Sequence, residues 1–464
     1  MIRSYWVLIF SLLCAPLTCR EAYRSPKENL IALQNGIERI LLDVGPEVHT
    51  GIEVVSLKNG ERLYQKSAHH LFVPANCQEM ITAAAALHQL GKDFRFETKL
   101  FTDGKVDQQR LNGNLYLQGS GDPEFAVRDL EELVFQLKLQ GISEITGNLY
   151  VDNTLFDGIW HGPGWISEEK GHNRNAPNDA LILNRSCIDL WVKPGDNIGE
   201  PPLVYQYPKS DFITIENHAE TTKEENRLSV KRRSTNKENI IDVVGKISSK
   251  TKPEHYSVPI EDPHLYTAYV LQSILVRAGF SFKGKIEAKA TPKNAIVLGK
   301  HASRPLYLIV LDMMKTSNPL AANCLFKKVG EKRFGAPGTW QKGSQAVREF
   351  LAQTVGINTD KMVIMDGCGL SRYNQISAHE FVTFLSWMYQ QFSYCPEFMS
   401  SLSEMGKVRA KTGAMMGISS CSGYLTTEDG EWIAFSILQN GITEKTPHID
   451  KKICKFLVSF SRKN

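Results

Sequence analysis

The chain has no strong excess of charge of either sign and no long apolar run beyond its N-terminus. Its 54 lysines and arginines stand against 50 aspartates and glutamates, so the net charge is only +4. That is too small to indicate a nucleic-acid-binding protein, for which a pronounced basic face is expected. A membrane helix needs about 20 consecutive apolar residues, and no segment after the N-terminus has them. With 464 residues, 42% of them hydrophobic, the chain is typical of a soluble protein of about two to three domains.

The cysteines lack the paired spacing of a metal or redox site. None of them forms a C-x-x-C, so zinc-binding and thioredoxin-like functions are not indicated, and the sequence predicts no metal or other cofactor. Scattered single cysteines mostly behave as small buried apolar residues. One or two disulfides would suit an exported protein, but the spacing leaves their pairing open. The cysteines are Cys14, Cys19, Cys77, Cys187, Cys324, Cys368, Cys395, Cys421 and Cys454.

The first residues have the pattern of a secretory signal. Arg3 supplies an early positive charge, and the apolar run Tyr5–Ala15 follows it. We therefore predict a signal peptide over residues 1–19 and an exported protein, periplasmic or associated with the cell envelope. An uncleaved anchor is one alternative, although the run is short for a membrane span. A lipid attached at Cys19 is another, and Pro16–Thr18 before that cysteine fits a lipid-attachment box poorly.

Helices and strands near both ends of the chain predict one mixed α/β domain. Glu28–Val44 has apolar residues at helical spacing, and the alanine-rich run Met80–Leu90 predicts a buried helix. Between them, Gly51–Leu57 and Glu61–Gln65 flank an Asn-Gly pair that signals a tight hairpin. Further helices are predicted at His264–Ala278, Pro305–Lys315, Gln341–Val355, His379–Gln391 and Asp450–Phe460, and further strands at Ser422–Thr426 and Trp432–Leu438.

The middle of the chain differs from its two ends in composition and in predicted secondary structure. Residues 93–259 are rich in short strand patterns, Gly/Asp turns and asparagine. We predict that they form a β-rich region inserted into a domain made of residues 20–92 and 260–464. Within this region Thr221–Asn239 is very polar, and charge runs of this kind are usually solvated loops.

One short motif near the C-terminus, Lys411-Thr412-Gly413, indicates a catalytic or binding site. K-T-G is one of three motifs of serine enzymes that bind penicillin, the others being S-x-x-K and S-x-N. The serine must open a helix, where the dipole favours developing negative charge, and the lysine one turn later takes its proton. K-T-G lies on a sheet-edge strand, where a peptide can add as a further strand. Its lysine and threonine then meet the terminal carboxylate.

S-x-x-K is missing from the place where it is expected. Before the helix at Met80, the chain reads Asn76-Cys77-Gln78-Glu79. Three segments match S-x-x-K by spacing alone, but they lie in polar stretches with no apolar helix after them, and we reject them. They are Ser167–Lys170, Ser234–Lys237 and Ser249–Lys252.

The surroundings of these motifs resemble a known family. Phe72–Leu87 is similar to the active-site segment of the penicillin-binding D-alanyl-D-alanine carboxypeptidase/endopeptidases, the low-molecular-mass, class C enzymes with a large insertion. The resemblance implies a β-lactamase/transpeptidase-like domain, with a central antiparallel sheet flanked by helices, interrupted by the inserted region. Further similar segments follow in order: Leu117–Pro123, Ala176–Asn184, Met314–Asn318, Asp366–Arg372 and Arg409–Tyr424.

The resemblance also implies the site, with two departures. Asn76 stands where the family has its nucleophilic serine, and Glu79 stands where it has the base lysine. The pair instead predicts a capping box, with Asn76 as N-cap and Glu79 at the third helical position. The implied catalytic positions are Asn76, Glu79, Thr316, Asn318 and Lys411, with Thr316 in place of a serine, and the implied substrate-binding residues are Lys411, Thr412 and Gly413.

Two neighbouring features offer weaker alternatives. The thiol of Cys77 at a helix start could be nucleophilic, but it lies about 100° around the helix from position 76, and a buried, inert thiol is expected. The adjacent pair His69-His70 suggests a metal site, but the sequence shows no third ligand. We therefore expect both histidines to be solvated.

Two functions remain in competition. The first is a serine-type D-Ala-D-Ala carboxypeptidase/endopeptidase of peptidoglycan metabolism, which acts on stem peptides ending in D-Ala and binds β-lactams. The second is a catalytically inactive homologue that binds such peptides or a cell-wall partner. Loss of the nucleophile, which costs several orders of magnitude in rate, favours the second.

Overall fold

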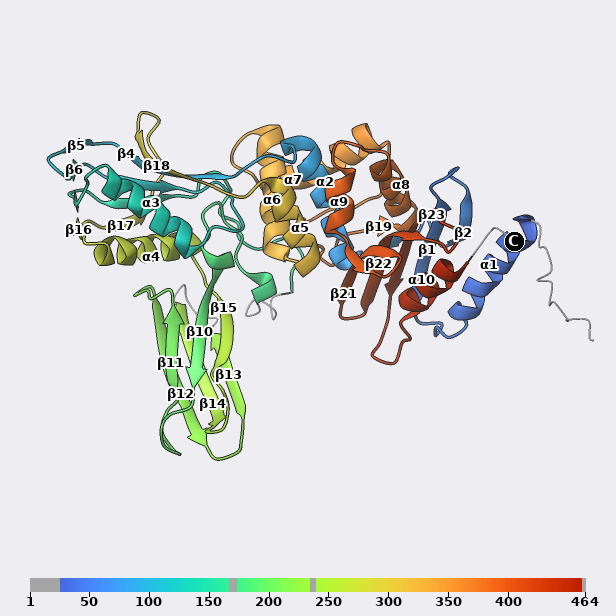
Figure 1. Cartoon of the computed structure of the whole chain (residues 1–464), viewed down its shortest axis with the longest axis horizontal. Coiled ribbons are helices and arrows are strands. Elements are labelled where there is room, and N and C mark those ends of the chain that lie inside the picture. Colours follow the sequence, from blue (N-terminus) through green and yellow to red (C-terminus); the bar gives the residue numbers. More distant parts are fainter. Residues whose placement is uncertain (1–25, 167–172, 234–238, 461–464) are drawn as a thin grey trace, which may run out of the picture.

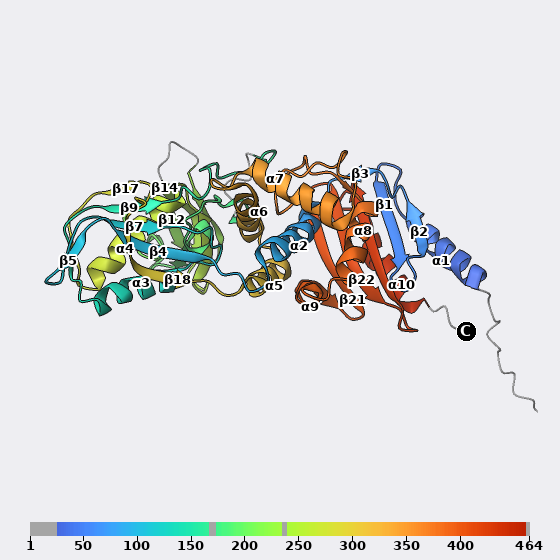
Figure 2. The same ribbon diagram turned by 90° about the horizontal axis from the view of Figure 1, so that it is seen from above.

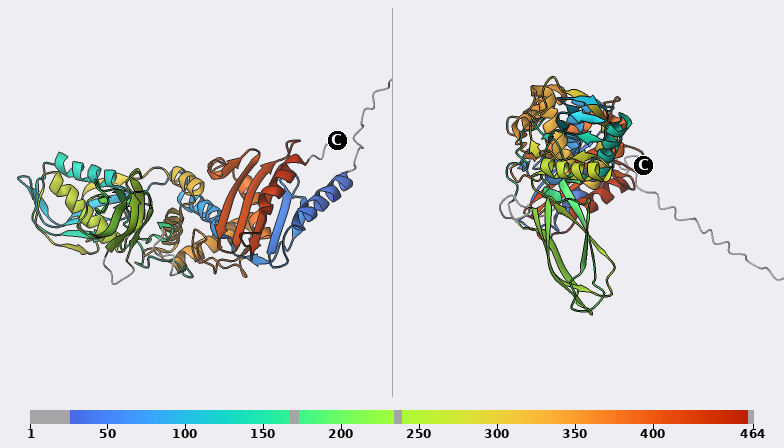
Figure 3. Two further views of the ribbon diagram at one scale, coloured as in Figure 1. Left: turned by 90° about the horizontal axis from the view of Figure 1, so that it is seen from below. Right: turned by 90° about the vertical axis from the view of Figure 1, so that its left-hand side faces the viewer.

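The computed structural model describes residues 26–166, 173–233 and 239–460, so the predicted signal peptide at 1–19 lies outside the described residues. Figure 1 shows an elongated molecule: a sheet at one end, a group of helices in the middle and the inserted region at the other end. A lobe projects sideways from the inserted region (Figure 3, right). Among the described residues, no helix is both long and apolar enough to cross a membrane.

The sheet at one end joins the two ends of the chain. Its six strands run in the order β2-β1-β23-β22-β21-β20, and β1 pairs antiparallel with β23 along its whole length. This confirms the predicted central antiparallel sheet. The strands are β1 (His49–Ser56), β2 (Arg62–Lys66), β20 (Ser403–Met405), β21 (Val408–Met415), β22 (Ile418–Thr426) and β23 (Trp432–Asn440).

Two helices from opposite ends of the chain cover one face of this sheet (Figure 3, left). They are α1 (Pro26–Leu41) and α10 (Ile449–Ser459). Leu33 and Ile37 of α1 and Ile453 of α10 share one buried cluster with the strands. The apolar spacing that predicted both helices is the spacing that buries these side chains.

The other face of the sheet packs on the central helices (Figure 2). In α2 (Gln78–Leu90) the alanines 83–86 are fully buried, and their small side chains let α6 (Pro319–Phe334) approach closely. Ser377 and Glu380 form a capping box at the start of α8 (Ala378–Tyr389). The remaining elements here are α5 (Leu306–Thr316), α7 (Trp340–Glu349), a π-helical turn (Phe350–Val355), α9 (Cys395–Ser401), β3 (Leu71–Phe72) and β19 (Ile376–Ser377).

The inserted region is built on a five-stranded sheet in the order β17-β9-β7-β4-β18, covered by α3 and α4. Because β18 pairs with β4, this unit runs to residue 302, and the predicted end at residue 259 falls inside it. Its elements are β4 (Glu97–Thr102), β5 (Lys105–Asp107), β6 (Arg110–Asn112), β7 (Leu115–Gln118), α3 (Val127–Leu139), β8 (Glu144–Ile145), β9 (Leu149–Asp152), α4 (Pro263–Arg277), β16 (Ser281–Phe282), β17 (Ile286–Ala288) and β18 (Ile296–Ala302).

The projecting lobe corrects one prediction. Thr221–Asn239 was expected to be a solvated loop, but β13 lies within it and pairs antiparallel with β14. Val230 of β13 is buried although Lys231 and Arg232 follow it directly, so the charged residues hid the pattern of a half-buried strand. Residues 234–238 lie outside the described chain. The strands are β10 (Cys187–Lys193), β11 (Leu203–Tyr207), β12 (Ile213–Thr222), β13 (Arg227–Arg232), β14 (Asn239–Ser248) and β15 (Glu254–Pro259).

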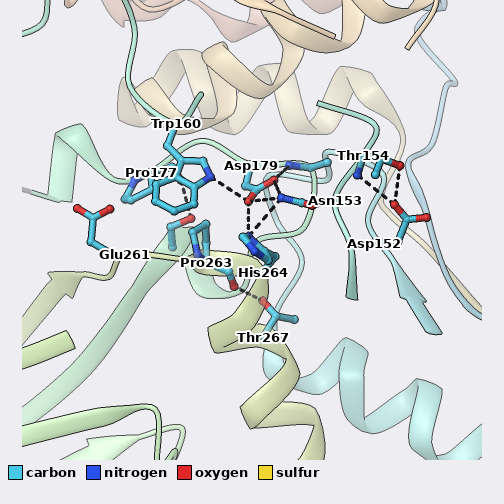
Figure 4. A network of polar contacts seen from close by, with 12 residues as sticks. Asp152, Asn153, Thr154, Trp160, Pro177, Asp179, Glu261, Pro263, His264 and Thr267 are labelled. Atoms are coloured by element: carbon cyan, nitrogen blue, oxygen red, sulfur yellow. Dashed lines mark hydrogen bonds and ion pairs between the residues drawn. The ribbon is translucent and has the colours of Figure 1, made fainter. Parts of the chain in front are cut away.

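A buried polar network fixes the loops that connect these parts (Figure 4). The Asp179 carboxylate is fully buried. It accepts hydrogen bonds from the side chains of Asn153 at 3.0 Å and Trp160 at 3.1 Å. It also accepts from the Ala180 backbone N–H at 2.7 Å and lies 2.7 Å from Nδ1 of His264, in the first turn of α4. These bonds satisfy the buried carboxylate and hold the segment 176–184, which borders the site described next.

Candidate functional site

The turn before α2 holds position 76 in a defined and strained conformation. The chain enters α2 through a short 3₁₀ turn, Ala75–Cys77, and Ala75 is left-handed with φ 46°. Non-glycine residues in this conformation cost about 1–3 kcal/mol and persist where the surroundings impose them. Here Gly369 packs so closely that a Cβ on it would lie 1.8 Å from the Ala75 carbonyl oxygen. The loop at 367–370 therefore clamps the turn.

The predicted capping box at Asn76 and Glu79 is wrong. The N-cap of α2 is Cys77, and no side chain caps the helix. Because the 3₁₀ turn already includes Asn76, its amide is free to turn inward, and Nδ2 donates to Glu79 Oε1 at 3.1 Å. The same amide reaches the Cys368 carbonyl at 3.4 Å. The two residues do interact, but as part of the site.

Glu79 and Lys411 form a buried ion pair at the centre of the site. Lys411 Nζ lies 2.8 Å from Glu79 Oε2, and the residues are 3% and 0% exposed. Lys411 also donates to the Met314 carbonyl at 3.0 Å. Burial raises the pKa of Glu79, and the neighbouring lysine opposes that shift. The charge of the K-T-G lysine is thus neutralised inside the protein.

Ser317 is the hydroxyl that completes this cluster, and it was not among the site residues predicted from the sequence. It accepts a hydrogen bond from Lys411 Nζ at 2.8 Å and donates to Glu79 Oε1 at 3.1 Å. Ser317 is left-handed with φ 49° at the break between α5 and α6. The signal was present in the sequence, because a serine directly before Asn-Pro marks the point where one helix ends and the next begins.

The two residues predicted on either side of Ser317 do not contact the ion pair. The Thr316 hydroxyl donates to the Asp312 carbonyl one turn earlier in α5, at 2.8 Å. The Asn318 side chain is the N-cap of α6 and accepts from the Ala321 amide at 3.2 Å. The structure therefore places Ser317, rather than Thr316, beside Lys411.

Thr412 and Gly413 lie on a strand whose outer side is open. β20 pairs only with Val408–Ala410, and no described strand pairs with residues 411–415 on that side. Thr412 is exposed. Gly413 brings the strand against the turn, because a Cβ on it would lie 2.6 Å from the Asn76 backbone nitrogen. A peptide added along this edge would pass position 76.

Cys77 and the histidine pair lie near the site without joining it. The Cys77 thiol is fully buried and donates to the Lys411 carbonyl at 3.2 Å. Burial raises the pKa of this thiol to about 11, so the reactive thiolate is scarce at neutral pH. His69 and His70 are exposed, and the ring of His69 packs on that of His379 at 4.4 Å.

A large cavity opens at Ser317. It has a volume of about 910 Å³ and lies between the junction of α5 with α6 and the inserted region. Its wall carries several ionisable residues: Glu124, Arg128, Arg174, Arg185, Asp189, His255, Arg304 and Asp312. The site is therefore open to ligands from the side of the inserted region.

Known proteins are similar to this chain over most of its length. The model of the D-Ala-D-Ala carboxypeptidase 3 (S13) family matches residues 33–403 and 397–460. A D-alanyl-D-alanine carboxypeptidase of Actinomadura sp. (strain R39) is 30% identical over 450 residues, covering 90% of this chain and 82% of the relative. The D-alanyl-D-alanine carboxypeptidase DacB of Haemophilus influenzae is 29% identical over 409 residues, covering 84% of each protein.

Solved structures show the same fold. Penicillin-binding protein 4 of Haemophilus influenzae superposes with a TM-score of 0.78 at 26% sequence identity. The match covers 88% of this chain and 93% of that protein. The inserted region is therefore part of the shared architecture.

Proposed function

Since this chain belongs to the D-Ala-D-Ala carboxypeptidase 3 (S13) family, we propose that it binds D-Ala-terminated stem peptides without forming an acyl-enzyme at position 76. The chain is a D-Ala-D-Ala carboxypeptidase/endopeptidase-like protein of peptidoglycan metabolism. The proposal concerns what its altered site still does.

The buried Glu79–Lys411 ion pair is the observation that supports the proposal. An acyl-enzyme needs a nucleophile and a group that removes its proton. The Asn76 amide is not a nucleophile, and Glu79 is already engaged by Lys411 at 2.8 Å. A buried pair of this kind is costly to break, so the cluster favours a stable binding site over turnover at position 76.

Peptide binding is supported by the edge of β21. A peptide can pair with the unpartnered strand at residues 411–415 by main-chain hydrogen bonds. The exposed Thr412 hydroxyl lies on this edge to meet a terminal carboxylate. Because Glu79 neutralises Lys411, the carboxylate adds less to the affinity than it would beside an unpaired lysine.

One observation favours a second candidate, acyl transfer through Ser317. Its hydroxyl donates to Glu79 Oε1 at 3.1 Å, so that carboxylate is placed to receive the proton. In this candidate β-lactams would modify Ser317 and leave Asn76 unmodified.

The proposed place of action is the cell envelope. The charged and apolar pattern of residues 1–19 is that of a signal peptide, and the relatives named above are D-alanyl-D-alanine carboxypeptidases. The proposed ligand, a stem peptide of peptidoglycan, is found there.

Calorimetry with Nα-acetyl-L-Lys-D-Ala-D-Ala tests the proposal. The protein should bind this peptide, release no D-Ala, and bind the C-terminal amide of the peptide more weakly. Thr412→Val should weaken binding, whereas Ala414→Ser, a small change at another exposed position of the same strand, should not. Release of D-Ala, or no binding at all, would contradict the proposal.

A further inference from the structure

The cavity that opens at Ser317 reaches arginines of the inserted region. One wall is formed by residues 316–320 at the junction of α5 and α6, and the opposite wall by Arg174, Arg185 and strands β10 and β15. Ser317 is 2.8 Å from Lys411 Nζ, so the cavity begins where the peptide terminus is proposed to bind. A side group of the peptide bound along β21 can therefore reach into it.

The charges of the cavity wall leave an excess of positive charge. Arg304 is paired with Glu124 and Asp312, and His255 lies 3.0 Å from Asp189. Arg128 lies 3.4 Å from the Asp129 carboxylate. Two wall arginines remain, Arg174 and Arg185, and within the described parts of the chain neither has an ion-pair or hydrogen-bond partner. Both are exposed in the cavity.

The backbone that carries Arg185 is strained and firmly held. Asn184, Arg185 and Ser186 are all left-handed, with φ 47°, 60° and 55°. Consecutive non-glycine residues in this conformation cost about 1–2 kcal/mol each. Buried hydrogen bonds impose it: Ser186 Oγ donates to the Pro177 carbonyl at 2.7 Å, and the Asn184 amide donates to the Phe125 carbonyl at 3.0 Å. The result is an arginine on a rigid turn, facing the cavity.

We propose that Arg185, assisted by Arg174, binds a carboxylate in the part of the peptide that precedes its D-Ala terminus. Arginine suits this role because its planar group can bind a carboxylate through two parallel hydrogen bonds. The ligand class is an acidic stem peptide, such as one with an unamidated D-glutamate. The inference rests on the proposed function for the placement of the peptide terminus, and it assigns a recognition role to the inserted region.

Two pentapeptides that differ in one group test the inference. They are L-Ala-γ-D-Glu-L-Lys-D-Ala-D-Ala and the same peptide with the D-Glu carboxylate amidated. The full chain should bind the acidic form about tenfold more tightly, as expected for one charge-assisted contact. Arg185→Gln should remove this preference, and Arg174→Gln should reduce it. Arg227→Gln is the matched control, because Arg227 is an exposed arginine of the inserted region that does not line the cavity.

The tripeptide L-Ala-γ-D-Glu-L-Lys separates this inference from the proposed function. Binding that Arg185→Gln weakens and Arg227→Gln does not would support the arginine site even if D-Ala-D-Ala peptides failed to bind. Equal affinity for the two pentapeptides would overturn it while leaving the proposed function intact. Equal weakening by Arg185→Gln and Arg227→Gln would also overturn it, because the effect would then be one of net charge. Thermal unfolding of each variant checks that the strained turn survives the substitution.

Discussion

Asn76, Glu79 and Lys411 determine what this site can do. The ion pair is buried and its two charges are matched, so either partner alone would be an uncompensated buried charge. Asn76 and Ser317 supply further hydrogen bonds to the Glu79 carboxylate. Asn76, Glu79, Ser317 and Lys411 thus form one connected polar cluster.

Breaking the pair from one side should cost much more than removing it. Lys411→Met leaves Glu79 buried without its cation and should lower the free energy of unfolding by about 3–5 kcal/mol. Glu79→Gln/Lys411→Met removes both charges and should cost much less. Urea unfolding of the single and double variants measures the difference, and purely additive losses would show that the pair is not coupled.

Asp122 should make stability fall as the pH rises through neutrality. The carboxyl group is buried beside α3, and burial raises its pKa from 3.8 to about 7. A group whose pKa is raised on folding stabilises the protein below its unfolded pKa, and this contribution is lost as the pH rises through the folded pKa. Between pH 4 and pH 8, wild type should lose about 4 kcal/mol relative to Asp122→Asn. Parallel unfolding curves for the two proteins across this range would refute the role of Asp122.

The elements around the site differ in how well the sequence predicts them. α2 was predictable because a run of alanines and apolar residues favours a helix, and this helix placed Asn76 in the turn before it and Glu79 in its first turn. The sequence marks the break between α5 and α6, but it does not show that the hydroxyl of Ser317, rather than that of Thr316, turns inward there. The strand at Arg227–Arg232 was not predicted because three of its six residues are charged and only Val230 is buried.

The contact between β21 and the turn at 75–77 should be sensitive to a single methyl group. In Gly413→Ala the new Cβ would lie 2.5 Å from Ser420 Oγ and 2.6 Å from the Asn76 nitrogen, so the strand or the turn must move. A loss of about 1–3 kcal/mol in stability is expected, together with weaker peptide binding. Ala414→Ser is the control on the same strand. Unchanged thermal unfolding and affinity in Gly413→Ala would contradict this packing.

The whole molecule has separate cores joined by a few specific contacts. The central helices form one buried cluster and the inserted region another, while a small cluster of Ile182, Leu320 and Cys324 lies between them. Lys327 of α6 strengthens this junction. It is fully buried, and its Nζ lies 2.7 Å from both Asp157 Oδ1 and the Ile159 carbonyl in the inserted region.

Removing this lysine should uncouple the two cores. Lys327→Met leaves the Asp157 carboxylate without its cation at the junction between the two cores. We expect the free energy of unfolding to fall by about 3 kcal/mol. In differential scanning calorimetry the variant should unfold in two separated transitions. Lys328→Met, which changes the neighbouring lysine paired with Glu331, should keep the wild-type profile. A profile of Lys327→Met that matches wild type would mean that other contacts hold the junction.

The most direct measurement is the intact mass of the protein after incubation with benzylpenicillin. Acyl-enzyme formation opens the lactam ring and adds the whole mass of the drug to one residue. Wild type should remain unmodified, whereas Asn76→Ser/Glu79→Lys, which restores the serine and the lysine of S-x-x-K, should gain one adduct at position 76. A stable adduct on wild type would contradict the account, and peptide mapping would then show whether Ser317 is the nucleophile.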